Sequence, residues 1–456
     1  MRSIAKWMLG SIVTVAMSAS APDLAAADCT WSVTGQLSVE HQLSELQAKY
    51  GGKSYLKGIK VKVSAKEKIF GVWGTWNSWG EEITSSSGSF SVTKTKNCNP
   101  RRFKAEVKFQ SDDLEVRYQY STSDPLTDVK WYTIYEETEG EHDAGTLSLG
   151  EKTFSSSGRQ DLNDWEARRH ADIWVLYQLA IEYVASLGSD YQFTTQIKVK
   201  YPHDGIAGDN VETSYANPTT KVIYIVKNSV KDCFNTPTLL HELGHIWAYN
   251  HTTGEICLTE TLLSNGSTHG LVDDPCVAFH EGFAEWWKDK VKEDLFGGGS
   301  VLPFNRSHLA SGSLGASLTN LSLMQRHDDG WLSVFHTLTT KDIHRYTFKE
   351  SGSSVTSAYI ENKPITIMTT NCSSPDLSFK NVLRVFNEDA SAGYPSKLSR
   401  DDTTIDAFLT RVEKILSSFT SDHRDLYKDL VDPSKTVQPS EKLCTTSIPP
   451  PPFPGR

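Results

Sequence analysis

Cysteine and methionine are scarce in this chain, with seven and five residues among 456. Seven cysteines spread over this length do not form the dense framework of a small disulfide-stabilised scaffold. Basic residues are also too few to dominate the surface, because 46 lysines and arginines are set against 56 acidic residues and the net charge is −10. A broad basic face is what nucleic-acid binding requires. We therefore predict no nucleic-acid partner.

Long apolar runs are missing as well. The stretch Trp7–Ala21 is apolar or small over about 15 residues, short of the roughly 20 that a membrane-spanning helix needs. Arg2 and Lys6 precede it and residues 25–27 are all alanine, which is the pattern of a cleaved signal peptide. We predict a signal peptide over residues 1–27, export to the periplasm or the extracellular space, and no transmembrane anchor.

The predicted export determines which oxidation state we expect for the cysteines. Outside the cytosol thiols tend to form disulfides, and all seven cysteines follow the predicted cleavage site. An odd number leaves at least one cysteine outside an intramolecular pair. Proximity in sequence suggests one pair, Cys257 with Cys276.

The rest of the sequence divides by its periodicity. Apolar and polar residues alternate between about residues 50 and 135, as at 59–63 and 103–109, which is typical of strands with one buried face. The pattern predicts a small antiparallel β-sandwich over residues 28–135. It resembles the transthyretin-like or carboxypeptidase-regulatory-like β-domains that accompany exported enzymes. Residues 136–163 are acidic and rich in Gly and Ser, and we predict a linker there.

Helical spacing begins at Asp164, a good N-cap, and ends at Gly188. Strand-like runs follow at 196–201 and 221–226, so helices and strands alternate in the predicted domain 164–346. An amphipathic helix at 405–419 indicates a mostly helical C-terminal region over 347–448. A Pro-rich tail over 449–456 is expected to be disordered. The sequence thus predicts an α+β multidomain protein.

The segment His241-Glu242-Leu243-Gly244-His245 carries the chemistry. Thr236 and Pro237 predict the start of a helix here, as N-cap and first helical residue. On a helix, His241 and His245 project from the same face and can bind one metal ion. Glu242 can then act on a water at that metal without being a ligand. The spacing predicts a catalytic zinc site, which requires a third protein ligand.

Two residues compete for that third position. Glu281 lies four residues before Glu285 on a second predicted helix that begins after Asp274, so that one carboxylate binds the metal and the other supports it. His251 completes a His-Glu-x-x-His-x-x-Ala-x-x-His pattern, with Ala248 where the metzincin pattern has Gly. Alanine favours a continued helix, which would carry His251 away. We favour Glu281 and keep a metzincin-like protease with His251 as the alternative.

The two predicted helices resemble those of the gluzincin metallopeptidases, the thermolysin and aminopeptidase N group. There a His-Glu-x-x-His helix is followed by one carrying Asn-Glu-Gly-Phe-Ala or a close variant, and this chain has His-Glu-Gly-Phe-Ala at 280–284. The resemblance covers residues 164–346 and implies a zincin-like catalytic domain. It also implies residue roles: zinc ligands His241, His245 and Glu281, general base Glu242, and Glu285 as the carboxylate that orients a ligand histidine.

The activity implied by the resemblance is zinc-dependent hydrolysis of a peptide or protein substrate. Glu242 takes a proton from the zinc-activated water and passes it to the leaving amine. We expect an extended peptide to pair with the strand at 222–226, as an edge strand. The downstream candidates for stabilising the oxyanion are His336, His344 and Tyr346. A further hypothesis is a non-catalytic surface binding protein on a metallopeptidase scaffold.

Overall fold

The structure is a computed structural model that describes residues 28–118, 129–156, 164–204, 214–217, 220–229, 231–253, 274–297, 325–326, 328–339, 342–351, 354–364, 377–387, 392–394 and 396–432. For 342–351 and 354–364 only the backbone is described. The predicted signal peptide, the Pro-rich tail and Cys257 lie outside these residues. The described chain combines sheets and helices, which confirms the general α+β architecture.

The first sheet is built around the long strand β1 (Asp28–Glu40). Its antiparallel partners are β6 (Ser89–Asn97) and β2 (Lys53–Tyr55), and its parallel partner is β10 (Gly145–Phe154). The parallel pair departs from the predicted all-antiparallel arrangement. It also places a ten-residue strand inside the predicted linker 136–163. Periodicity missed β10 because only Leu149 and Phe154 of its ten residues are buried, and its main-chain bonds to β1 hold it in place.

The second sheet packs against the first. Its strands are β4 (Val72–Trp73), β3 (Lys60–Ile69), β7 (Arg101–Lys108) and β9 (Tyr132–Glu136) in that order, with β5 (Asn77–Ile83) paired to β3. Every second side chain of β7 is buried, as its alternation predicts. Trp31 of the first sheet meets Trp79 of the second edge to face, with ring centroids 6.0 Å apart.

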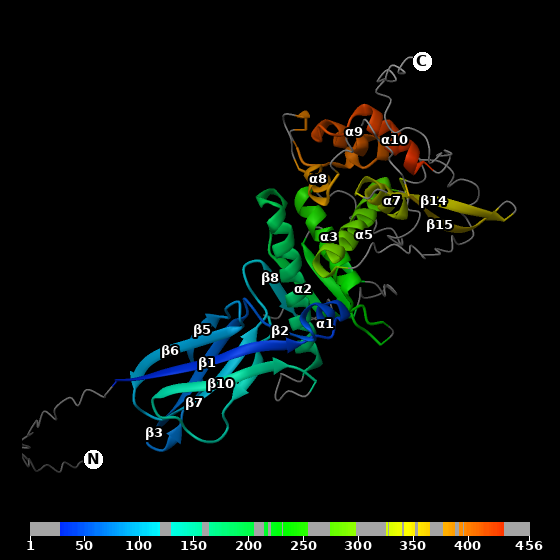
Figure 1. The fold of residues 1–456 in the computed structure, drawn as a ribbon. Coiled ribbons are helices and arrows are strands. Elements are labelled where there is room, and N and C mark those ends of the chain that lie inside the picture. The colour runs from blue at the N-terminus through cyan, green and yellow to red at the C-terminus, as the bar shows by residue number, and fades with distance from the viewer. Residues whose placement is uncertain are drawn as a thin grey trace, which may run out of the picture.

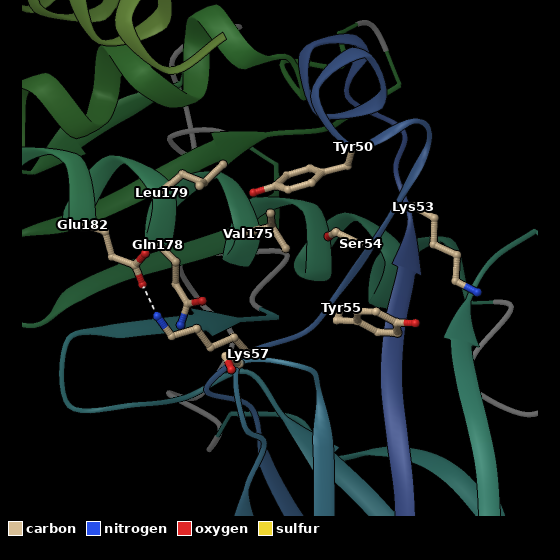
Figure 2. A pocket seen from close by; sticks show the side chains of 10 residues that line it. Tyr50, Lys53, Ser54, Tyr55, Lys57, Val175, Gln178, Leu179 and Glu182 are labelled. Carbon is tan, nitrogen blue, oxygen red and sulfur yellow. Dashed lines mark hydrogen bonds and ion pairs between the residues drawn. The ribbon is translucent and has the colours of Figure 1, made fainter.

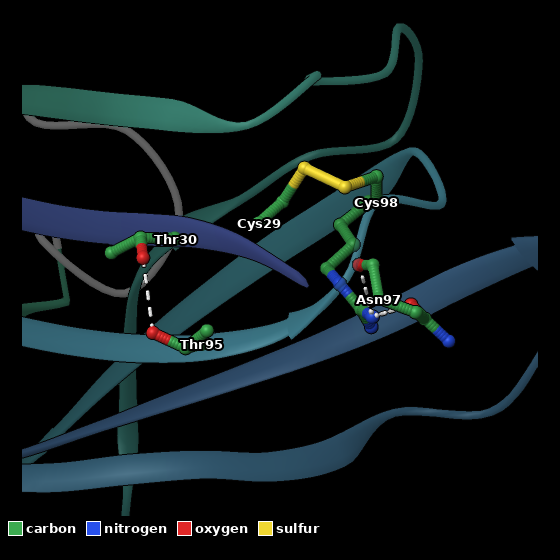
Figure 3. The surroundings of a disulfide bond; sticks show 6 residues. Cys29, Thr30, Thr95, Asn97 and Cys98 are labelled. Carbon is green, nitrogen blue, oxygen red and sulfur yellow. Dashed lines mark hydrogen bonds between the residues drawn. A yellow bond between two sulfur atoms is a disulfide. The ribbon is translucent and has the colours of Figure 1, made fainter. Parts of the chain in front are cut away.

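A disulfide joins Cys29 to Cys98 at the end of the β1–β6 pair (Figure 3). It fits an oxidising compartment. Proximity in sequence could not find it, because the two cysteines are 69 residues apart and meet only through strand pairing. Cys276 is also disulfide-bonded, and its predicted pairing with Cys257 stays a prediction.

A third sheet has the strand order β12 (Tyr215–Asn217), β13 (Val222–Val226), β11 (Ile197–His203) and β8 (Leu114–Arg117). β8 was expected in the β-sandwich, but it pairs in parallel with β11. Its alternating Leu114 and Val116 predict a strand without indicating which strand is its partner. β13 was expected at an edge, and it lies between β11 and the antiparallel β12.

Helices complete the fold. They are α1 (Ser44–Tyr50), α2 (Trp165–Leu187), α3 (Thr236–His251), α5 (Pro275–Phe296), α7 (Asp328–Thr339), α8 (Phe379–Arg384), α9 (Ile405–Ile415) and α10 (Ser421–Val431), with short 3₁₀ turns η2 (Ser189–Tyr191) and η4 (Arg400–Asp402). A hairpin of β14 (Asp342–Ser351) and β15 (Ser354–Pro364) interrupts the predicted helical C-terminal region. In Figure 1 the first two sheets lie at one end, α8 to α10 at the other, and α2, α3 and α5 between them. Of the helices described, none is long and apolar enough to cross a membrane.

Helix α2 connects the first two sheets to the rest of the molecule. Asp164 caps it, as predicted, by accepting a hydrogen bond of 2.8 Å from the Glu166 N–H. Six residues on, the fully buried His170 lies 2.8 Å from the Tyr132 hydroxyl of β9 and 2.6 Å from the Tyr201 carbonyl oxygen of β11. A neutral imidazole satisfies both partners, since Nε2–H donates to the carbonyl and Nδ1 accepts from the hydroxyl.

His170 should make the fold sensitive to acid. Burial lowers its pKa from 6.5 to about 4, so the unfolded chain takes up the proton first. The neutral imidazole's contribution is complete above pH 6.5 and is lost as the pH falls toward 4, by about 3 kcal/mol in total. We expect wild type to lose more unfolding free energy than His170→Gln between pH 7 and pH 4.5 in urea titrations. Equal losses in the two proteins would contradict this assignment.

Candidate metal centre

Helix α3 carries the His-Glu-x-x-His segment and begins one residue earlier than Thr236 suggested as the cap. The N-cap is Asn235, whose side chain accepts a hydrogen bond of 2.8 Å from the Thr238 N–H. The Thr236 hydroxyl instead donates to Glu45 of α1, at 2.7 Å. Asn235 and Thr236 are both residue types that cap helices. Asn235 is the cap here, and the Thr236 side chain contacts α1.

Helix α5 lies against α3 with very little space between the backbones. Asp274 caps α5 as predicted, accepting from the Cys276 N–H at 3.0 Å. A Cβ atom added to Gly244 of α3 would lie only 3.2 Å from the Ala284 Cα of α5. On another face of α5, a Cβ at Gly282 would lie 2.5 Å from the Asp328 carbonyl oxygen at the start of α7. Small residues thus let three helices meet closely around the motif.

Gly282→Ala should therefore destabilise the protein. The new methyl group would clash with backbone atoms that cannot rotate away, and such overpacking typically costs about 1–3 kcal/mol. Gly244→Ala is a matched control, because its closest contacts are 3.2–3.3 Å and a smaller loss is expected. Urea or thermal unfolding measures both. A Gly282→Ala protein as stable as wild type would show that α5 and α7 are not in this contact.

The structure brings His241, His245 and Glu281 together as the group of side chains, among the described residues, that can hold a metal ion. The two Nε2 atoms are 3.1 Å apart, and Glu281 Oε2 lies 3.3 Å from His241 Nε2 and 3.2 Å from His245 Nε2. Tetrahedral ligands with zinc bonds of about 2.0–2.1 Å stand about 3.3 Å from one another. All three side chains are buried. The spacing and the donor set fit zinc.

The negative charges of the carboxylates around this cluster also favour a bound cation. Glu242, Glu281 and Glu285 are all buried there, and buried carboxylates are stabilised by positive charge placed beside them. Burial alone would lower the pKa of His241, but the neighbouring carboxylates, led by Glu285, outweigh burial and raise it to about 10. The site therefore holds positive charge strongly, which a divalent ion would supply in place of a proton.

Glu285 contacts His241 on the side of the imidazole ring that faces away from the cluster. Its Oε1 lies 3.0 Å from His241 Nδ1, and its Oε2 contacts the ammonium of the buried Lys288. Asp289 lies 3.5 Å from the same ammonium. A carboxylate on Nδ1 orients the imidazole so that Nε2 faces the metal. Glu285 thus contacts His241 at Nδ1, the ring nitrogen that does not face His245 and Glu281.

His251 does not reach the cluster, so the alternative third ligand is wrong. Helix α3 continues through Ala248 without a break and ends at His251. The ring is stacked on Trp247 with centroids 4.1 Å apart. Its Nδ1 lies 3.1 Å from Asn387 Oδ1 and its Nε2 lies 3.1 Å from the Gln192 carbonyl oxygen. Without a helix-breaking glycine at position 248, the helix continues and keeps this histidine away from the cluster.

The oxyanion candidates are placed elsewhere or not described. His336 of α7 lies 3.3 Å from Asp289, one helical turn beyond Glu285 along α5. His344 and Tyr346 belong to β14, whose side chains lie outside the description.

A tyrosine that the sequence motifs did not single out lies beside His245. Tyr249 follows His245 by four residues, and their rings are stacked with centroids 5.9 Å apart. Its ring is also 5.7 Å from that of His280. Burial raises the pKa of Tyr249 well above its ordinary value, and Glu281 and Glu242 raise it further, so the hydroxyl stays a hydrogen-bond donor. The same spacing of four that identified His241 and His245 would have found it.

Comparisons with known proteins add little to this geometry. No family model and no curated protein matches the chain. Among solved structures, the crystal structure of a 9R-lipoxygenase from Cyanothece PCC8801 matches with 14% sequence identity and a TM-score of 0.15, covering 34% of this chain and 23% of the lipoxygenase chain. A superposition this poor carries no information about fold or function.

Proposed function

We propose that this protein is an exported zinc-dependent peptidase of gluzincin type. In this proposal a β-sandwich domain precedes a zincin-like domain, and a mostly helical region follows. The observation that carries it is the convergence of His241 Nε2, His245 Nε2 and Glu281 Oε2 at 3.1–3.3 Å. Glu242, which follows His241 in the sequence, is proposed as the general base. Glu285, which contacts His241 Nδ1, is proposed as the carboxylate that orients this histidine.

The chemistry follows from the residues around the cluster. A bound zinc ion would polarise the scissile carbonyl and lower the pKa of water to about 7. Glu242 accepts a proton from the attacking water while the water oxygen bonds to the carbonyl carbon. The same carboxyl group then gives the proton to the amine as the C–N bond breaks. The burial of Glu242 keeps this proton transfer away from bulk solvent.

An extended substrate needs an exposed sheet edge beside α3. β13 is covered on one side by β11 and along Val222–Tyr224 by β12. Among the strands that the structure describes, β12 stands at the end of this sheet, and it contacts α3. The substrate is therefore assigned to β12, with main-chain hydrogen bonds giving binding that is largely independent of side chains.

We assign Tyr249 the role of stabilising the oxyanion through a hydrogen bond from its hydroxyl. Loss of one preorganised donor typically costs about 10²–10³ in kcat. Tyr249→Phe should lower kcat by about 10²-fold, with KM and zinc content near those of wild type, since the hydroxyl is not a ligand. Tyr427→Phe, a buried tyrosine of α10, is the control. A Tyr249→Phe enzyme with wild-type kcat would remove Tyr249 from the mechanism.

The proposal is tested by incubating the zinc-loaded protein with a peptide library. Cleavage that a chelator abolishes and added zinc restores is the expected result. A protein that holds one zinc ion per chain yet cleaves no peptide would favour the non-catalytic binding scaffold instead.

A further inference from the structure

A second constellation of reactive side chains lies away from the metal centre, where α2 meets the first sheet. Asp172 Oδ1 of α2 is 2.7 Å from His41 Nδ1, and His41 Nε2 is 2.9 Å from Ser54 Oγ of β2. The side chains of His41 and Asp172 are fully buried. Carboxylate, imidazole and hydroxyl thus follow one another in the order that activates a serine nucleophile.

The backbone around His41 fixes this arrangement. The second carboxylate oxygen of Asp172 accepts hydrogen bonds from the Gln42 and Leu43 N–H groups, at 2.6 and 3.1 Å. The His41 N–H donates to the Gly52 carbonyl oxygen at 2.8 Å. Because a carboxylate only accepts, the His41 proton sits on Nδ1 and the lone pair of Nε2 faces the Ser54 hydroxyl. This is the tautomer that a general base needs.

Ser54 also borders a cavity, which a purely structural brace would not require. Ser54 is half-buried and lines a cavity of about 490 Å³ between β2 and α2, within the range of small-molecule sites. Figure 2 shows Tyr50 and Ser54 facing Val175 and Leu179 of α2. The cavity has room for a small molecule, and its wall combines apolar and polar groups.

The cavity also offers a hydrogen-bond donor for developing negative charge. The ring centroids of Tyr50 and His41 are 5.5 Å apart. The Tyr50 hydroxyl points across the cavity in Figure 2. Burial and then Glu182 raise the pKa of Tyr50, so the hydroxyl keeps its proton. Glu182 is itself paired with Lys57 at 2.6 Å, so the wall carries no uncompensated charge at that point.

We propose that Ser54, His41 and Asp172 form a second hydrolytic site, specific for small carboxylic esters. Ser54 Oγ bonds to the ester carbonyl carbon while its proton passes to His41 Nε2. The carbon–oxygen bond to the alcohol breaks, and the leaving oxygen takes that proton. Water then adds to the acyl group and gives a proton to His41 Nε2. The bond to Ser54 breaks as Ser54 Oγ takes that proton back, which releases the acid and restores the hydroxyl.

The test is covalent labelling of the full chain by a fluorophosphonate probe, followed by peptide mass spectrometry. The serine oxygen bonds to phosphorus, fluoride leaves, and the proton goes to His41. We expect the adduct at Ser54, no adduct in Ser54→Ala, and labelling slowed by about 10²–10⁴-fold in Asp172→Asn. Ser91→Ala, which removes an exposed serine of β6, should label like wild type.

Hydrolysis of p-nitrophenyl acetate provides a second readout that separates this site from the metal centre. We expect turnover that persists in excess chelator and is lost in Ser54→Ala with an unchanged circular dichroism spectrum. The proposal is overturned if the wild-type protein is not labelled, if the adduct is on another residue, or if chelator removes the esterase activity. The labelling outcomes do not involve the metal centre, so this proposal can hold or fail independently of the proposed peptidase function.

Discussion

Glu242→Gln is expected to lower kcat/KM for peptide hydrolysis by about 10³-fold while the protein still binds one zinc ion. Glutamine keeps the size of the side chain but cannot accept the proton of the attacking water, and general acid–base catalysis contributes about 10²–10⁴-fold. Glu242 is buried next to His241 and is not one of the three residues of the cluster, His241, His245 and Glu281. Steady-state kinetics and metal analysis of the same preparation measure both quantities.

The control for Glu242 is Glu293→Gln, which removes a carboxylate on α5 that contacts Lys290 and is more exposed. It should keep wild-type kcat/KM. If Glu242→Gln kept more than about a tenth of the wild-type rate, the assignment of Glu242 as general base would be wrong, because even a weak general base contributes about 10²-fold.

Glu281→Gln is expected to remove tight zinc binding. Catalytic zinc sites take three protein ligands, and loss of the anionic one should lower affinity by more than the roughly 10–100-fold typical when a residue that only orients a ligand is replaced. Glu285→Gln, which contacts His241 but not the metal position, should fall within that smaller range. Competition with a chromophoric zinc chelator gives all the affinities on one scale.

His251→Gln completes this series as the variant without effect on zinc affinity. Its ring nitrogens contact Asn387 and the Gln192 carbonyl rather than the cluster. Unfolding should be measured in parallel, because His251 is buried and its loss affects packing. A folded His251→Gln protein that lost zinc, together with a Glu281→Gln protein that kept it, would reverse the assignment of the third ligand.

The parts of the site that the sequence predicted are those set by local geometry. Helical spacing alone places His241 and His245 on one face and puts Glu285 one turn from Glu281. The caps Asp164 and Asp274 were predicted for the same reason, since a side chain bonds to a backbone group two residues away.

Features that depend on long-range pairing could not be predicted in this way. Strand β10 has few buried side chains and is held by its bonds to β1, more than a hundred residues earlier. The short β12 makes β13 an inner strand, which periodicity cannot reveal. Asp172 and His41 are 131 residues apart, and neither lies in a local motif. Only the packing of α2 against the first sheet brings them together.

The ligand set of the metal centre can be measured directly by X-ray absorption at the zinc edge of the zinc-loaded protein. The proposed site predicts two imidazole nitrogens at about 2.0–2.1 Å and oxygen ligands at about 2.0–2.2 Å, with no sulfur. Glu281→Gln should change the oxygen shell, and His251→Gln should leave the spectrum as in wild type. Three imidazoles, or sulfur at about 2.3 Å, would contradict the assignment of His241, His245 and Glu281 as the zinc ligands.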